Sequence, residues 1–342
     1  MKIKDLELKL TEHSYKKAFH IAHSSKTITE NILVKLIYDN GITGIGEASP
    51  SLRVNGEVAS VLPGYERPLK EMLMGMDGRK YGIIFEKTEF LSKPSPSLKA
   101  AIQYAALDAF SKYCNTSVHE ILGGKKEYVE TDYTVSIGTF EESAKEAKEL
   151  SKNGYKTIKI KVGEDLNTDI ERIRAIADAA PNAEFIVDAN TGYTPKQSVH
   201  FADILYRDNI PVLVFEQPVP VNDIEGMKFV RNNSKFPVAA DESVRSRYDA
   251  FNLIKENAVD FINIKLMKTG ITDALSIIEL AKTACINLMI GCMAESGTGI
   301  SQSIHLAAGT GAFTYHDLDS HMLLKETKEH NFKQVGNKLY PM

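Results

Sequence analysis

The chain has 342 residues, 43% of them apolar and 25% charged, a mix typical of globular proteins that excludes a disordered or fibrous architecture. Its net charge is −4, from 41 Lys and Arg against 45 Asp and Glu, and no basic tract stands out, so neither nucleic acid nor a membrane is an expected partner. No apolar run approaches the roughly 18 residues of a membrane helix, and the three cysteines are widely spaced. We therefore expect a cytoplasmic protein with reduced thiols.

The first ~125 residues are expected to form a small α+β domain. Residues 2–10 and 31–39 have strand patterns, and Asn40-Gly41 followed by residues 42–48 indicates a hairpin. From residue 57 to about 123 the pattern is helical, most clearly over 97–122, and Gly123-Gly124 is a plausible helix stop.

After residue 130 strand and helix patterns alternate. Eight strand candidates follow one another, at 133–137, 157–162, 184–189, 212–216, 238–241, 261–267, 287–293 and 314–318. Helix-start signals such as Thr194-Pro195 lie between them. This rhythm predicts a parallel barrel. A doubly wound open sheet is the rival, but residues 133–138 offer no glycine-rich phosphate turn.

The expected strands carry charged residues at their carboxyl ends, where barrel enzymes place their catalytic groups. These residues are spaced by about one strand–helix unit: Lys159 and Lys161, then Asp188, Glu216, Asp241 and Lys265. Lys159 and Lys161 are two apart and share one face of their strand, so both are expected to point into the barrel mouth.

Three carboxylates on adjacent strands repel one another unless a cation neutralises them. Asp188, Glu216 and Asp241 form an all-oxygen set without His or Cys, which suits Mg²⁺. We expect one Mg²⁺ per subunit at this position.

These motifs resemble a known family. Lys-x-Lys at 159–161, the Asp/Glu/Asp series and Asn263-Ile-Lys265 are similar to the enolase superfamily, in particular its muconate-lactonizing subgroup. The helical sequence 98–109 and Leu122-Gly-Gly124 extend the resemblance over nearly the whole chain. Within the subgroup, residues 291–296 (Gly-Cys-Met-Ala-Glu-Ser) and 316–319 (His-Asp-Leu-Asp) resemble the dipeptide epimerases.

The resemblance implies an α/β fold, with a modified TIM-type (β/α)7β barrel over residues 126–320. An N-terminal α+β capping domain, residues 1–125, would be joined by the C-terminal residues 321–342. The implied reaction is Mg²⁺-dependent epimerisation of L,L-dipeptides at the α-carbon of the C-terminal residue, by 1,1-proton transfer through an enediolate.

The resemblance also implies roles for single residues. Lys161 and Lys265 would be the two acid–base groups, on opposite faces of the α-carbon, and Lys159 would contact the substrate carboxylate. Asp317 and Asp319 would hold the ammonium group of the dipeptide. Further substrate-binding positions are Thr134, Ser24, Met293 and Glu295.

The substrate side chains are less clear. Epimerases acting on alanyl-glutamate use an arginine of the first capping loop, where this chain has Ser24, so we expect neutral or hydrophobic dipeptides, although Lys26 and Arg53 leave an acidic side chain open. The leading alternatives are an o-succinylbenzoate synthase or a cycloisomerase of the same subgroup. A Schiff-base aldolase and a binding protein on a barrel that has lost its activity are further alternatives. A homo-oligomer is compatible with the sequence.

Overall fold

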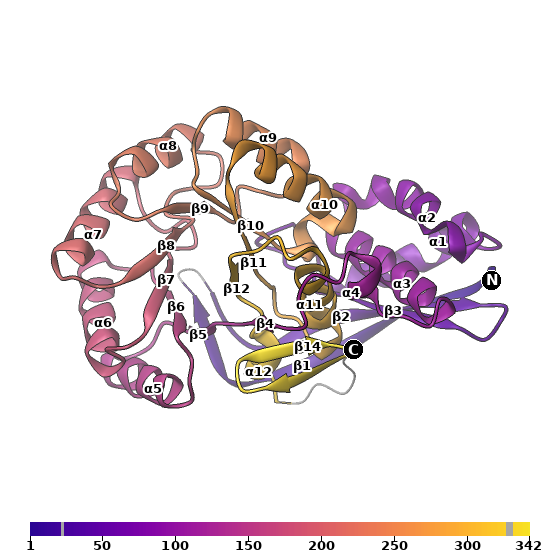
Figure 1. The fold of residues 1–342 in the computed structure, drawn as a ribbon, viewed down its shortest axis with the longest axis horizontal. Helices are drawn as coiled ribbons and strands as arrows, with labels where there is room; N and C mark the ends of the chain where they lie inside the picture. Colours follow the sequence, from indigo (N-terminus) through magenta and orange to yellow (C-terminus); the bar gives the residue numbers. More distant parts are fainter. Residues whose placement is uncertain (22–23, 326–330) are drawn as a thin grey trace.

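The computed structural model describes residues 1–21, 24–325 and 331–342. An N-terminal α+β domain lies beside a larger body of alternating strands and helices (Figure 1). Among the described residues, no helix combines the length and the apolar character that crossing a membrane requires.

The N-terminal domain is an antiparallel sheet covered by helices. Its strands are β1 (Ile3–Ile21), β2 (Ser24–Tyr38) and β3 (Thr43–Ala48), in the order β1-β2-β3. The helices are η1 (Ala59–Tyr65), α1 (Glu66–Leu73), η2 (Gly78–Lys80), α2 (Tyr81–Thr88), η3 (Glu89–Ser92), α3 (Pro96–Tyr113) and α4 (Val118–Ile121). Strand β3 runs so close to α3 that a Cβ at Gly44 would lie 1.9 Å from the carbonyl oxygen of Ala105. Close packing therefore explains the glycine there.

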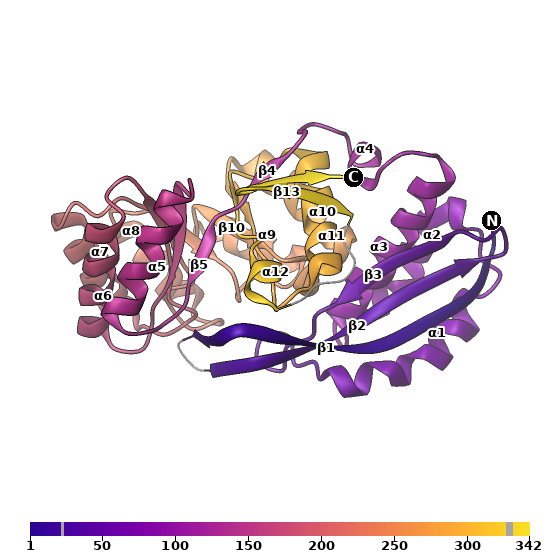
Figure 2. The same ribbon diagram turned by 90° about the horizontal axis from the view of Figure 1, so that it is seen from below.

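The first two strands are much longer than predicted. The first strand was expected to end near residue 10, and the second to begin at residue 31. Instead, β1 and β2 form a hairpin that extends past the N-terminal domain and along the barrel (Figure 2). Lys26 and His20 are therefore strand residues. A register shift between Ser14 and Phe19, a large bulge, breaks the alternation that reveals a strand in sequence.

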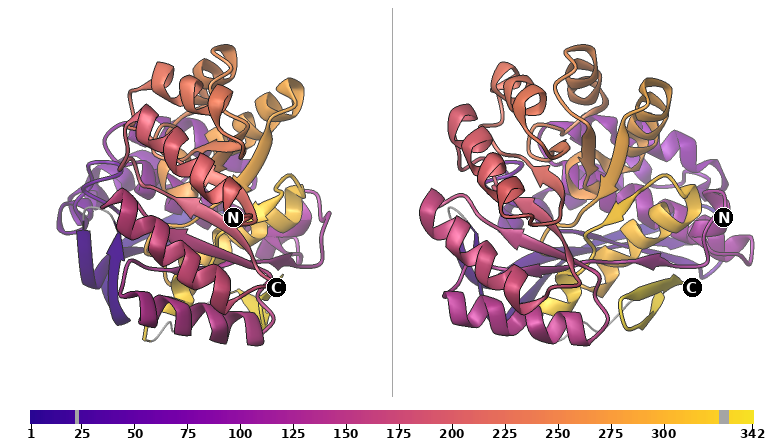
Figure 3. Two further views of the ribbon diagram at one scale, coloured as in Figure 1. Left: turned by 90° about the vertical axis from the view of Figure 1, so that its left-hand side faces the viewer. Right: turned by 60° about the vertical axis from the view of Figure 1, so that its left-hand side comes forward.

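The second body contains eight parallel strands and seven intervening helices. The strands are β5 (Tyr133–Val135), β6 (Thr157–Lys161), β7 (Glu184–Asp188), β8 (Val212–Glu216), β9 (Val238–Ala240), β10 (Phe261–Ile264), β11 (Asn287–Ile290) and β12 (Tyr315–His316). The helices are α5 (Phe140–Lys152), α6 (Leu166–Ala179), α7 (Pro195–Arg207), α8 (Ile224–Asn233), α9 (Arg247–Lys255), α10 (Leu266–Ala284) and α11 (Gly297–Thr310). They form an outer arc around the curved sheet, which confirms the predicted barrel class (Figure 3).

Most strands end earlier than predicted. The largest differences, of three residues each, are at the sixth and seventh barrel strands, which were expected to reach residues 267 and 293 but end at Ile264 and Ile290. Lys265 is the N-cap of α10, with extended backbone, so its side chain still points from the strand end. Helix α7 begins as predicted, with the Thr194 hydroxyl accepting a hydrogen bond from the N–H of Gln197.

The first and last barrel strands meet without a paired ladder. The N–H of Asp132 donates to the carbonyl oxygen of His316 (2.9 Å), and the N–H of Leu318 donates to the hydroxyl of Thr131 (2.9 Å). These bonds form the seam of the barrel.

After α12 (Ser320–Leu323), the C-terminal strands β13 (Phe332–Val335) and β14 (Lys338–Pro341) form a sheet with β4 (Val129–Glu130). A bridge between Leu324 and Tyr15 and the bond from the N–H of Lys325 to the carbonyl of Ser14 join the described C-terminal segment to β1. The assignment of residues 321–342 to the capping domain stays a prediction.

Candidate active site

Three buried carboxylates meet at the carboxyl ends of neighbouring strands. Asp188 ends β7, Glu216 ends β8 and Asp241 follows β9 directly. One ligand oxygen from each lies within 4.8 Å of the others. Beneath them, two residues earlier on the same strands, Ile186, Val214 and Ala239 belong to an apolar cluster that fills the inside of the barrel. A set of three carboxylates above a dry apolar layer fits a hard divalent cation such as Mg²⁺.

Two lysines flank the carboxylates from opposite sides. Lys161, at the end of β6, has its Nζ 2.6 Å from Oδ2 of Asp188. Lys265, after β10, has its Nζ 2.7 Å from Oδ2 of Asp241. Because the strand order runs β6-β7-β8-β9-β10, the carboxylate cluster lies between the two ammonium groups.

Lys159 has a different environment from Lys161. Its side chain is fully buried, with Nζ 2.7 Å from Asp317, 2.8 Å from Glu216 and 3.1 Å from Asp188. Burial opposes its charge, but the surrounding carboxylates raise the pKa of Lys159 well above its usual value. Lys159 therefore forms ion pairs with these three carboxylates, and it does not line the cavity described below.

The carboxylates do not share one electrostatic environment. Burial raises the pKa of Asp188, but Lys161 and Lys159 outweigh it and lower that pKa to about 2. Burial and the charge of Asp188 raise the pKa of Glu216 to about 7. For Asp241, burial is outweighed by Lys265 and by a further lysine, Lys268, and its pKa is lowered.

The sequence analysis did not predict Lys268 as a member of this cluster, nor the contacts that Asn263 and Asn190 make in it. Lys268 is buried and its Nζ lies 2.5 Å from Oδ1 of Asp241, and the Asn263 amide donates to Glu216 (2.7 Å). Asn190 donates to Glu242 (3.1 Å), a buried carboxyl beside Asp241. The signal for Lys268 was its position three residues after Lys265, one helical turn along α10.

A cavity of about 420 Å³ lies above the lysines, between the barrel and the N-terminal domain. Among its lining residues are Lys161, Lys265, Thr134, Met293, Asp317 and Asp319. Glu295 does not line it: that side chain is completely buried, and its Oε1 accepts the N–H of Met293 (2.9 Å). The side chain of Ser24 lies outside the described residues.

The two aspartates after β12 face this cavity together. Oδ2 of Asp319 accepts the N–H of Thr134 (2.6 Å), and Cys292 Sγ lies 3.9 Å from its Oδ1. Burial and the charge of Asp317 raise the pKa of Asp319 to about 6. Two close acidic groups in a buried position create a site for a cationic hydrogen-bond donor.

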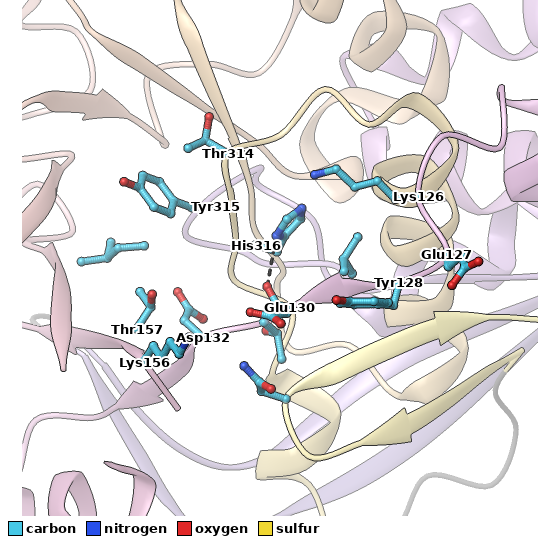
Figure 4. A pocket seen from close by; sticks show the side chains of 14 residues that line it. Lys126, Glu127, Tyr128, Glu130, Asp132, Lys156, Thr157, Thr314, Tyr315 and His316 are labelled. Carbon is cyan, nitrogen blue, oxygen red and sulfur yellow. Dashed lines mark hydrogen bonds between the residues drawn. The ribbon is translucent and has the colours of Figure 1, made fainter. Parts of the chain in front are cut away.

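A second cavity, of about 560 Å³, lies at the opposite end of the strands, where β4, β5, β6 and β12 begin (Figure 4). His316 faces it and bonds through Nδ1 to the carbonyl of Glu130 (3.1 Å). None of the residues predicted to act in catalysis or substrate binding lines this cavity.

Comparison with known proteins gives matches over the whole chain. Residues 142–338 match the family model "Enolase C-terminal domain-like", and residues 6–123 match "Mandelate racemase / muconate lactonizing enzyme, N-terminal domain".

The chain is 52% identical to an L-Ala-D/L-Glu epimerase from Thermotoga maritima, covering 95% of this chain and 94% of that protein. It is 36% identical to an aromatic dipeptide epimerase from Herpetosiphon aurantiacus, covering 94% of this chain and 89% of that protein. Among solved structures it resembles the dipeptide epimerase from Enterococcus faecalis in complex with Mg and L-Leu-L-Tyr. That match has a TM-score of 0.94 at 33% identity and covers 100% of this chain and 98% of that chain.

Proposed function

The chain belongs to the mandelate racemase/muconate lactonizing subgroup of the enolase superfamily and is a dipeptide epimerase, and on that basis we propose that it inverts the α-carbon of the C-terminal residue of an L,L-dipeptide. The family and the activity predicted from the sequence are thereby confirmed. The roles of single residues and the substrate are our proposal.

One observation carries the proposal: two lysines face each other across the carboxylate cluster. Lys161 and Lys265 both line the cavity and come from opposite sides of the cluster. A substrate α-carbon held between them presents its proton to one ammonium or amine group and its opposite face to the other. One lysine removes the proton, the other delivers a proton to the opposite face, and the configuration is inverted.

Asp188, Glu216 and Asp241 would hold Mg²⁺, because their oxygens converge and no nitrogen or sulfur ligand is among them. When bound, Mg²⁺ supplies positive charge beside the substrate carboxylate, which stabilises the negative charge of an enediolate. Solved relatives in complex with a dipeptide, among them the dipeptide epimerase from Enterococcus faecalis, also contain Mg, which supports this choice of metal.

The two ends of the dipeptide then have separate sites. Its carboxylate lies toward the metal carboxylates, and its ammonium group lies toward Asp317 and Asp319, whose carboxyls face the cavity. Lys159 positions Asp317, Glu216 and Asp188 by ion pairs from below. Met293 and Thr134 contribute to the cavity wall, and Glu295 fixes the backbone of Met293.

The test is a set of L,L-dipeptides incubated with the protein and Mg²⁺ in D₂O. We expect a mass gain of about one unit at the C-terminal α-carbon and the appearance of the L,D-diastereomer. Exchange at the N-terminal residue, or conversion only of a succinylbenzoate or muconate-type substrate, would contradict the proposal.

A further inference from the structure

A buried network of charged and polar side chains lies between α6 and the carboxyl ends of β6 and β7. Asp169 and Arg172, three residues apart on α6, form an ion pair, and Tyr193, in the loop after β7, donates its hydroxyl to Asp169 (2.6 Å). The three residues are 0%, 2% and 3% exposed, and none of them lines the active-site cavity. A buried ion pair is costly to desolvate, and apolar residues of similar size often stabilise a fold as well, so fold stability alone does not account for this one.

Asp169 connects the two loops that follow β6 and β7. Its Oδ2 accepts the N–H groups of Gly163 (2.8 Å) and Glu164 (3.2 Å), two and three residues after Lys161. The same oxygen accepts the hydroxyl of Tyr193 from the neighbouring loop. One buried carboxylate therefore holds both loops in place.

Arg172 extends the network to the backbone of Lys161 itself. Its Nη2 pairs with Asp169 and also donates to the carbonyl oxygen of Lys161 (3.3 Å). The end of β6 is thus held at the carbonyl of Lys161 by Arg172 and, two residues later, at the N–H of Gly163 by Asp169.

The loop after β7 needs such contacts to keep its shape. Asn190 and Thr191 have φ angles of 42° and 71°, in the left-handed region that is strained for residues other than glycine. A Cβ at Gly192 would lie 2.3 Å from the carbonyl oxygen of Gly163, so the two loops are in close contact. The hydroxyl of Tyr193 then ties the strained segment to Asp169.

These contacts fix the relative position of Lys161 and its carboxylate partner. Lys161 and Asp188 are paired in the register of β6 and β7, and the lysine Nζ lies 2.6 Å from Oδ2 of the aspartate. A shift of either loop would move the ammonium group relative to the substrate α-carbon, and proton transfer is sensitive to such misplacement. The hydrogen bonds and ion pair of the network do not involve Lys265, within the described part of the chain.

We propose that Asp169, Arg172 and Tyr193 are positioning residues that hold Lys161 in place and thereby set the rate of proton transfer on one face of the substrate; this rests on the proposed two-lysine epimerisation. Lys265, on the opposite side of the carboxylate cluster, acts independently of them. Loss of the network therefore weakens one of the two proton transfers and spares the other.

The experiment measures exchange of the α-proton in D₂O with Mg²⁺ present. The substrates are the L,L-dipeptide that the wild type epimerises fastest in the set described above and its L,D-diastereomer, each measured separately. Tyr193→Phe removes one hydroxyl and keeps the ring, and Asp169→Asn removes the charge. The control, Tyr38→Phe, removes the hydroxyl of another buried tyrosine, on β2, for which the described residues provide no hydrogen-bond partner. Lys161→Ala identifies the diastereomer whose exchange needs Lys161.

Exchange distinguishes the two faces, whereas epimerisation does not, because inversion in either direction uses both lysines. We expect Tyr193→Phe and Asp169→Asn to slow exchange of the Lys161-dependent diastereomer by about tenfold or more, and to change exchange of the other by less than about twofold. Tyr38→Phe should leave both rates as in the wild type.

A fall of equal size for both diastereomers, or no fall for the Lys161-dependent one, would overturn the inference. Tyr193→Phe decides alone if Asp169→Asn does not fold, since the phenylalanine retains the packing of the ring. Failure of the proposed function has a different result: Lys161→Ala and Lys265→Ala would then lose exchange of the same diastereomer, or the wild type would exchange no dipeptide.

Discussion

The ammonium group of Lys159 lies 2.7 Å from Oδ2 of Asp317, and the two residues are 0% and 4% exposed. Asp317 thus already has a cationic partner inside the protein. Asp319 has no lysine or arginine partner among the described residues and receives the N–H of Thr134. The sequence analysis gave Asp317 and Asp319 the same role, that of holding an ammonium group. In the structure they differ, because the negative charge of Asp317 is already paired with Lys159 and that of Asp319 is not.

For this reason, Asp319→Asn should lower kcat/KM for free dipeptides by about tenfold or more, since a charge-assisted hydrogen bond contributes roughly 1.5–3 kcal/mol. The same substitution should raise the melting temperature at pH 8, because it removes a buried carboxylate whose pKa is raised to about 6. Steady-state kinetics and thermal denaturation measure the two effects. Equal rates for free and N-acetylated dipeptides with the wild type would rule out an ammonium site here.

The two flanking lysines should be separable by the stereochemistry of exchange. Lys161→Ala and Lys265→Ala should each abolish epimerisation, because inversion needs a proton donor on both faces. Each variant should still exchange the α-proton of one diastereomer in D₂O, and the two variants should exchange opposite ones. Mass spectrometry of the L,L- and L,D-dipeptides provides the measurement. Exchange of the same diastereomer by both variants would mean that the lysines do not act from opposite faces.

Removal of the metal should abolish activity. We expect EDTA to stop epimerisation and added Mg²⁺ to restore it, because no other group near the substrate carboxylate can supply a divalent charge. Asp241→Asn should lower kcat by several orders of magnitude and keep the far-UV circular dichroism of the wild type. Asp178→Asn, an exposed position on α6, serves as the control. Full activity after exhaustive chelation would contradict the metal site.

Glu47 should make the stability of the protein depend on pH. Its buried carboxylate on β3 accepts hydrogen bonds from the backbone of Ser296 (2.8 Å) and from Asn31 (3.0 Å), and burial raises its pKa from 4.5 to about 7. A carboxyl with a raised pKa favours the folded state below its unfolded pKa, and this contribution is lost as pH rises through 7. Relative to Glu47→Gln, the wild type should therefore lose up to about 3 kcal/mol of unfolding free energy between pH 4.5 and 7.

Urea denaturation at several pH values measures this difference. Glu30→Gln, an exposed position on β2, is the matched control and should not change the pH dependence. Parallel pH profiles of the wild type and Glu47→Gln would show that Glu47 does not titrate in this range.

The sequence predicted the barrel and the convergence of its three carboxylates, because both follow from the regular strand–helix repeat. Asp188, Glu216 and Asp241 are spaced by about one strand–helix unit each. The regular repeat of the barrel places the ends of neighbouring strands side by side, and this alone brings the three carboxylates together. The alternation of side chains along β6 gave Lys159 and Lys161 a common face, although burial then separates their contacts.

Other parts depend on contacts that no short rule describes. The hairpin of β1 and β2 contains a bulge, so its strands have no clean period, and the aromatic residues Tyr15 and Phe19 that it delivers to the cavity were missed. Glu295 was expected to contact the substrate because residues 291–296 resemble a motif of the dipeptide epimerases, but its side chain is buried and accepts the N–H of Met293.

The seam between β5 and β12 has a consequence for how the enzyme assembles. The hydrogen bonds between Asp132 and His316 and between Leu318 and Thr131 join segments separated by more than 180 residues. Closing the seam is therefore a long-range contact that is expected late in folding. Thr134 and Asp319 meet across the same seam. The proposed ammonium site therefore forms only when the ring of strands closes, and hydrogen exchange at the amide of Thr134 would report both events.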